Sequence, residues 1–147
     1  MKHLYCIFPF LFIFLVFNCG STKNTESFPI QKDSNILYDK TWQLEYVSGI
    51  NTNVEDLFPN KKPELTFDSL GNMVRGNAGC NGYSATFTKN GDEISFSDPG
   101  PSTLMYCGDG EPTFLKIMTK INRYSVDGDG KLNLMVDDVP VMRFHKL

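Results

Sequence analysis

The most informative part of this sequence is the glycine-rich stretch Gly76-Asn77-Ala78-Gly79-Cys80-Asn81-Gly82-Tyr83-Ser84-Ala85-Thr86-Phe87. We expect its glycines to adopt backbone conformations that a side chain would forbid; these are Gly76, Gly79 and Gly82. Asn81 suits a turn or a bulge, because its amide can hydrogen-bond nearby backbone. From Tyr83 to Phe87 apolar and polar residues alternate, which is typical of a half-buried strand. The stretch therefore predicts a tight turn that leads into a β-strand.

Alternating segments of the same kind lie on both sides of this stretch, separated by turn residues. Asn90-Gly91 lies between two of them and predicts a type I′ hairpin turn, which needs positive φ angles. The predicted strands are Trp42–Tyr46, Pro63–Phe67, Met73–Gly76, Tyr83–Phe87, Glu93–Phe96, Lys131–Val136 and Val141–Phe144.

One segment, Glu111–Arg123, breaks this period of two. Its apolar residues recur every three or four positions and are Phe114, Ile117, Met118 and Ile121, with Leu115 alongside. This spacing predicts an amphipathic helix with one apolar stripe, in which Pro112 fits only the first turn. Short strands with one late helix predict the α+β class: a small antiparallel, incomplete barrel-like β-sheet wrapped around one α-helix.

The stretch 76–87 also resembles the signature of the META domain, the family of the HslJ heat-shock proteins. Four other places agree with that family in the same order: Trp42-Gln43-Leu44, Thr103-Leu104-Met105-Tyr106-Cys107, Glu111-Pro112-Thr113-Phe114-Leu115 and the closing strands between Tyr124 and Phe144. The agreement extends over about residues 41–146. Two positions depart from the family pattern, since Tyr106 stands where alanine is usual and Ala85 where glycine is common.

The resemblance implies a small α+β domain with an incomplete barrel around a helix. It also implies a set of signature residues with a structural role, namely Gly79, Cys80, Asn81, Thr103, Met105 and Cys107. The family is associated with heat, antibiotic and envelope stress and has no accepted enzymatic activity. The resemblance therefore implies no catalytic residue, and we expect neither a cofactor nor a metal.

The four cysteines are Cys6, Cys19, Cys80 and Cys107. If Cys6 leaves with a leader and Cys19 carries lipid, Cys80 and Cys107 are a candidate disulfide in an oxidising compartment. Such a bond would stabilise the fold by about 3–4 kcal/mol. The alternative is two separate buried thiols. Two cysteines without a nearby cysteine or histidine give too few ligands for structural zinc.

The chain begins with a targeting pattern. A short positive start, Met1-Lys2-His3, precedes an apolar run over residues 4–17, which is shorter than the roughly 20 residues that cross a bilayer. The run suits a secretory signal and ends at Val16-Phe17-Asn18-Cys19-Gly20-Ser21, which resembles the lipobox of bacterial lipoproteins. We expect lipid on Cys19, with ordinary secretion as the alternative.

These patterns divide the chain into a lipoprotein signal peptide (1–18), a polar flexible tether (19–36) and a META domain (37–147). The expected location is the cell envelope, with the lipid at Cys19 as the contact with the membrane, on the periplasmic side of an outer membrane or at the cell surface. The whole chain has 14 basic and 17 acidic residues. A mildly acidic domain without a basic block predicts no nucleic-acid partner.

One acidic segment has the best metal-binding pattern in the sequence. Asp127-Gly128-Asp129-Gly130-Lys131 fails as a calcium loop, because Lys131 stands where a third oxygen ligand belongs. The segment is interpreted as a Gly-rich hairpin between the last two strands.

One hypothesis for the function is an enzyme with a site of scattered residues such as Glu45, Arg75, Asp109 and His145. The favoured hypothesis is a non-enzymatic, membrane-tethered envelope protein that binds a partner protein, or an apolar or peptide ligand, under stress. A structural envelope protein stays open as a third.

Overall fold

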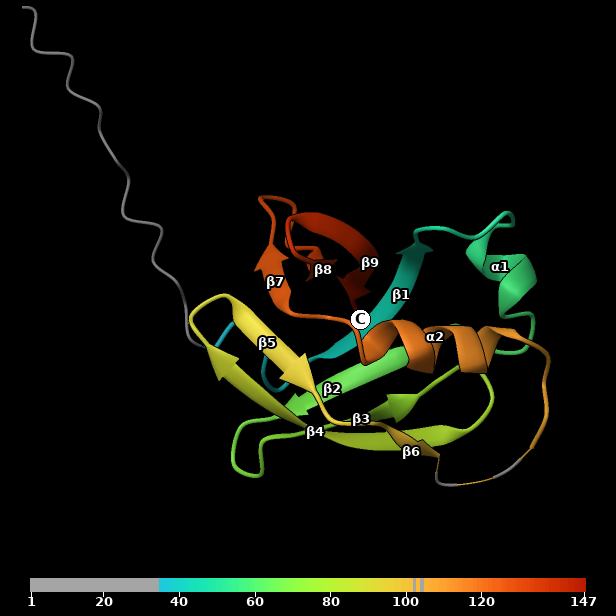
Figure 1. Ribbon diagram of the computed structural model, residues 1–147, viewed down its shortest axis with the longest axis horizontal. Coiled ribbons are helices and arrows are strands. Elements are labelled where there is room, and N and C mark those ends of the chain that lie inside the picture. Colours follow the sequence, from blue (N-terminus) through green and yellow to red (C-terminus); the bar gives the residue numbers. More distant parts are fainter. Residues whose placement is uncertain (1–34, 102, 104) are drawn as a thin grey trace, which may run out of the picture. The chain divides into compact units, whose positions relative to one another are not determined.

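Figure 1 shows the computed structural model of the protein, which describes residues 35–101, 103 and 105–147. The predicted signal peptide, Cys19 and the predicted tether up to residue 34 lie outside the described residues. The elements are β1 (Thr41–Val47), α1 (Val54–Leu57), β2 (Glu64–Asp68), β3 (Met73–Asn77), β4 (Gly82–Asn90), β5 (Glu93–Phe96), β6 (Gly100–Pro101), α2 (Gly110–Met118), β7 (Arg123–Val126), β8 (Leu132–Val136) and β9 (Val139–Lys146).

The strands form one antiparallel sheet that closes on itself. Its order is β3-β2-β1-β9-β8-β7-β5-β4-β6, and an additional pairing of β3 with β4 joins the two sides. The weakest place in this ring lies between β5 and β7, whose ladder has the single pair Glu93↔Arg123. The predicted α+β class and incomplete barrel are confirmed.

Helix α2 lies against the inner side of the curled sheet (Figure 1). Phe114 and Met118 are fully buried. The Phe114 ring contacts the ring of Tyr83 on β4 at 5.6 Å and that of Phe144 on β9 at 6.5 Å, both measured between centroids. The helix therefore packs against strands from two sides of the ring, which is how a single apolar stripe fills the barrel.

The helix is shorter than predicted, since it ends at Met118 rather than at Arg123. The chain leaves it through a tight turn in which Lys120 N–H donates to the Ile117 carbonyl, and Asn122 N–H already donates to Met135 on β8. Arg123 is needed in the sheet, where it pairs with both Glu93 and Met135. Ladder formation thus overrides the helical period, although Ile121 of the predicted stripe is still buried.

Two turns differ from the prediction. The loop between β4 and β5 consists of Gly91 and Asp92, because Asn90 pairs with Glu93. Gly91 has a φ of 64° and Asp92 is not among the residues with positive φ, which is the pattern of a type II′ turn rather than type I′. The Asp127–Lys131 segment joins β7 to β8, not the last two strands.

The short helix α1 and strand β6 have no counterpart in the prediction. Asn53 caps α1, since its Oδ1 accepts a hydrogen bond of 2.7 Å from Asp56 N–H. The chain then turns at Phe58, whose ring is buried against the signature stretch. Through this ring α1 helps to position the site described next.

Candidate functional site

The signature stretch and the loop before α2 meet at one place, which we call the signature corner. It consists of Gly79, Cys80, Asn81, Thr103, Met105, Cys107 and Glu111. A disulfide joins Cys80 to Cys107, the pairing considered from the sequence, with 5.8 Å between the two Cα atoms. The bond fixes the loop before α2 to the turn between β3 and β4.

Asn81 is the centre of the corner, and its side chain is buried with 3% exposure. Its Nδ2 donates to the Met105 carbonyl at 2.6 Å, and its Oδ1 accepts from Met105 N–H at 3.0 Å. Oδ1 also accepts from the Thr103 hydroxyl. We expected Asn81 to bond to nearby backbone, and the structure corrects this: the side chain holds a loop more than twenty residues further along the chain, as the separation of 24 residues to Met105 shows.

Glu111 in the first turn of α2 completes the corner. Its carboxylate accepts from Asn81 N–H at 2.7 Å and from Asn81 Nδ2 at 2.9 and 3.0 Å. From the sequence, Glu111 was identified only as the first residue of the predicted helix and of a family motif, so its contact with Asn81 was missed. The signal was present in the Glu-Pro-Thr-Phe motif, but nothing local indicates that the partner is Asn81.

The glycines of the signature stretch are required for different structural reasons. Gly79 has a φ of 103°, and a Cβ there would lie 2.4 Å from Cδ1 of Phe58. Gly76 is needed for space instead, because a Cβ would lie 1.8 Å from the Glu64 carbonyl oxygen of the neighbouring strand. Gly82 is not among the residues with positive φ. The expected special conformation is therefore found only at Gly79.

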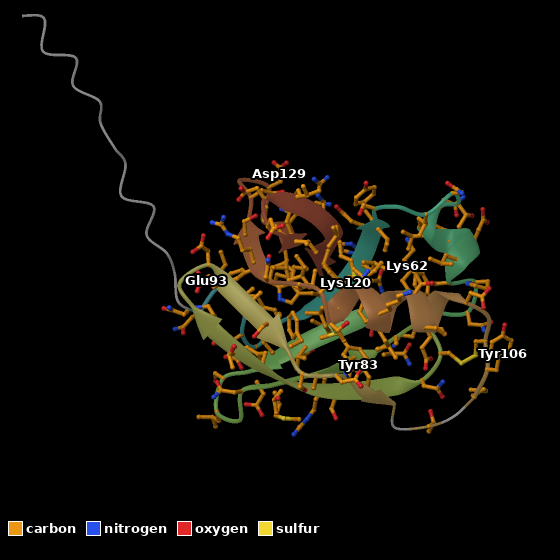
Figure 2. All side chains as sticks on the ribbon, viewed as in Figure 1. Lys62, Tyr83, Glu93, Tyr106, Lys120 and Asp129 are labelled. Carbon is orange, nitrogen blue, oxygen red and sulfur yellow. A yellow bond between two sulfur atoms is a disulfide. The ribbon has the colours of Figure 1, made fainter. Side chains whose placement is uncertain are left out.

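The outer side of the corner is apolar. Met105 is 63% exposed and Tyr106 is 80% exposed. Figure 2 shows Tyr106 at the outer edge of the domain, directed away from the core. These two side chains border a hollow of about 240 Å³ whose other walls come from Asn81, Thr103, Cys107, Gly108, Glu111 and Pro112. The Tyr106 hydroxyl donates to Oδ1 of Asp109 at 3.4 Å.

A second and larger hollow, of about 600 Å³, lies where β5 and β7 barely pair. Three of the charged groups that line it, Lys89, Asp92 and Arg123, already have partners. Arg123 contacts Asp92 at 2.5 Å and Asp138 at 2.6 Å, and Lys89 lies over the Tyr124 ring. Hydrogen bonding to Asp92, with the nearby charges of Asp92 and Asp138, raises the pKa of Arg123. The Arg123 guanidinium is thus already paired with the carboxylates of Asp92 and Asp138.

The four scattered residues of the enzyme hypothesis do not form one site. His145 Nδ1 lies 3.6 Å from Glu45 Oε2, and Lys131 also bonds to this carboxylate. Arg75 lies on β3 and Asp109 directly before α2, and within the described ranges no hydrogen bond or ion pair links either to Glu45 or His145. Only the Glu45–His145 pair of this hypothesis is brought together.

In the Asp127–Lys131 turn, the side chain of Asp127 accepts hydrogen bonds from the backbone of the turn. Asp127 Oδ1 accepts from the N–H groups of Asp129 at 3.1 Å and Lys131 at 2.9 Å. These bonds, that to Lys131 first, lower the pKa of Asp127. Across residues 35–101, 103 and 105–147, no three His, Cys, Asp or Glu side chains gather as a metal site.

Neither helix in the described part of the chain is long and apolar enough to cross a bilayer. Among solved structures, a protein from Burkholderia xenovorans studied by NMR is 24% identical, with a TM-score of 0.59, and the match covers 78% of this chain and 87% of that one. A crystal structure of a DUF4847 family protein from Bacteroides vulgatus is 11% identical, with a TM-score of 0.54 and coverage of 76% and 94%. At these identities the likeness concerns the fold.

No protein of curated function matches this sequence. The family model described as META domain matches residues 35–146, which include all the strands and helices found in the described residues and the whole signature corner. The chain belongs to the META domain family.

Proposed function

We propose that this protein is anchored in the cell envelope by lipid on Cys19 and binds a partner protein through Met105 and Tyr106. The single observation that carries the binding proposal is that these two apolar side chains are exposed on a loop that is fixed from behind. Exposed apolar groups favour association when a partner covers them. A loop that is already held by a disulfide and by Asn81 loses little further entropy on binding.

The anchor and the setting are supported by the sequence. The apolar run over residues 4–17 and the lipobox-like stretch around Cys19 favour lipidation, and the family resemblance favours a role in heat or antibiotic tolerance. A tether between lipid and domain would let the signature corner reach partners away from the bilayer surface. Binding then takes place on the periplasmic side of an outer membrane or at the cell surface.

Photo-crosslinking in the native cells tests the binding proposal. A benzophenone amino acid replaces Tyr106 in the full-length protein, and the matched control carries it at Leu70, which is 96% exposed in the turn between β2 and β3. We expect a discrete crosslinked product from position 106 that grows under heat or antibiotic stress and that Asn81→Ala weakens. The same products from both positions, or none from 106 under any condition, would contradict the proposal.

The anchor is tested separately. Cys19→Ala should remove the acyl mass from the intact protein and move the domain from the membrane fraction to the soluble fraction. Mass spectrometry and fractionation of the same cells give both readouts. A Cys19→Ala protein that stays with the membrane and keeps the same mass difference would sink the lipoprotein proposal and leave the binding proposal standing.

A further inference from the structure

We propose that the hollow beside Tyr106 binds a basic side chain, a lysine or an arginine in an exposed segment of the partner protein. The inference rests on the proposed function, since it names the chemistry by which the signature corner would recognise that partner. It is carried by the volume of the hollow, by its apolar walls and by two carboxylates, Glu111 in the wall and Asp109 beside it, neither of which forms an ion pair with a described residue.

The walls suit the stem of a long basic side chain. Met105, Tyr106 and Pro112 give the hollow an apolar rim, and its volume is about 240 Å³. Lysine and arginine cover apolar surface with their methylene stems while the charged group stays hydrated or paired. The exposed ring of Tyr106 adds a π face that attracts a cation.

Among the described residues, the one charged group that lines the hollow is an acceptor, the carboxylate of Glu111. Oε2 of Glu111 receives two hydrogen bonds from Asn81, but Oε1 receives one, of 3.0 Å. A carboxylate oxygen can accept two, so Oε1 keeps the capacity for another donor. Asp109 does not line the hollow but lies beside it, since its Oδ1 accepts a hydrogen bond from the hydroxyl of the rim residue Tyr106. It adds a second carboxylate near the hollow, and the Tyr106 hydroxyl bonds to Oδ1 alone.

The charge at this place is not neutralised from within the domain. Among residues 35–101, 103 and 105–147, no Lys, Arg or His forms an ion pair with Glu111 or Asp109. The N-terminus of α2 supplies about half of one positive charge, which offsets only part of two carboxylates. The hollow therefore keeps a negative potential beside an aromatic ring, and the complementary ligand is a cation with an apolar stem.

The larger hollow makes a useful contrast. There Arg123 is bonded to Asp92 and Asp138, so a ligand that binds Arg123 or Asp92 would first have to displace an existing pair. A basic ligand at the hollow of the signature corner would displace no ion pair, because in the described part of the chain Glu111 and Asp109 accept hydrogen bonds only from uncharged N–H and O–H groups.

The test uses the full-length protein in detergent micelles, labelled with ¹⁵N. Two blocked pentapeptides are titrated at low ionic strength, each with glycine at four positions and either lysine or norleucine in the centre. Norleucine has the lysine stem without the charge. We expect the lysine peptide to shift the amide signals of Met105, Tyr106 and Gly108, and to bind about fivefold more tightly than the norleucine peptide.

Variants separate charge from shape. Asp109→Asn and Glu111→Gln each remove one charge, and Tyr106→Leu removes the π face but keeps an apolar side chain. We expect each to lower the preference for lysine, while the control Glu93→Gln on β5 leaves it unchanged. Equal binding of both peptides, or a preference that survives Asp109→Asn and Tyr106→Leu together, overturns the inference.

The outcomes also separate this inference from the proposed function. Crosslinks from position 106 without a preference for lysine mean that the loop binds its partner by other chemistry, and only the inference fails. A preference for lysine without crosslinks in cells means that the hollow takes a basic ligand and that the proposed partner is wrong.

Discussion

Two regions of this domain use polar side chains in opposite ways, and Figure 2 places Tyr106 of one and Glu93 of the other on opposite sides of the view. At the signature corner the buried Asn81 bonds to backbone and to Glu111, and apolar side chains face outward. At the seam between β5 and β7, charged side chains face outward and pair with one another. Burial decides the difference: a buried amide must be satisfied and therefore fixes its surroundings, whereas an exposed ion pair exchanges with water at little cost. We therefore expect the buried hydrogen bonds to hold the corner in one conformation, and the exposed charges to keep the seam hydrated.

Removal of the disulfide should break the corner most strongly. We expect Cys80→Ser with Cys107→Ser to lower the free energy of unfolding by about 3–4 kcal/mol, because the unfolded chain regains the freedom of the closed loop. Urea unfolding measures the loss. A dithiol reductant should destabilise the native protein similarly and leave the double variant unaffected. A loss near zero would mean that the polar contacts alone hold the loop.

Asn81→Ala should have the next largest effect. It removes the side-chain bonds to Met105, Thr103 and Glu111 together and leaves the bond from the Asn81 backbone N–H to Glu111. We expect a loss of about 2–3 kcal/mol with faster amide exchange at Met105 and Tyr106. The control is Asn90→Ala, which removes an exposed asparagine at the end of β4. If both variants unfold at the same urea concentration, the buried amide has no special weight.

Asp127 is an intermediate case, because it bonds to backbone like Asn81 but is exposed like the seam. Its folded-state pKa lies below its ordinary value of 3.8. Its contribution to stability is therefore fully present above that value and is lost as the pH falls through the lower folded-state pKa. We expect Asp127→Asn to be less stable than the native protein at neutral pH and to approach it in acid. A difference that stays constant with pH would show that shape rather than charge holds the turn.

Arg123→Gln should have the smallest effect, although Arg123 bonds to two carboxylates. Exposed pairs contribute little and are screened by salt, so we expect a small loss at low ionic strength that shrinks further at high ionic strength. Urea unfolding at both salt concentrations measures it. A loss as large as that of Asn81→Ala, or one that salt does not change, would end the contrast between corner and seam.

The parts of the fold that were predictable from sequence are those with local signals. Alternation over a few residues marked most strands, and the stripe through Phe114 and Met118 marked α2. The short helix α1 was missed because its four residues are too few to show a period. The predicted end of α2 was wrong because Arg123 pairs with β5 and β8 instead of continuing the helix. No local sequence pattern indicates this pairing.

The site shows the same division. The motif residues of the corner could be chosen from the resemblance, but their contacts could not. Asn81 reaches Met105 and Glu111 over 24 and 30 residues, and Phe58 comes from a segment with no signal of its own. Contacts of this range depend on how the ring closes, so sequence reasoning placed Asn81 in a local turn.

The pairing of β1 with β9 has a consequence for when the domain can fold. Trp42 in β1 pairs with Lys146 in β9, so this ladder joins strands from the two ends of the domain. Ladders between residues so far apart form slowly, because a long loop must close before any contact rewards it. β1 therefore lacks one of its two neighbours until β9 has left the ribosome. Under the proposed export, the ring of strands therefore cannot close until β9 is available on the far side of the membrane.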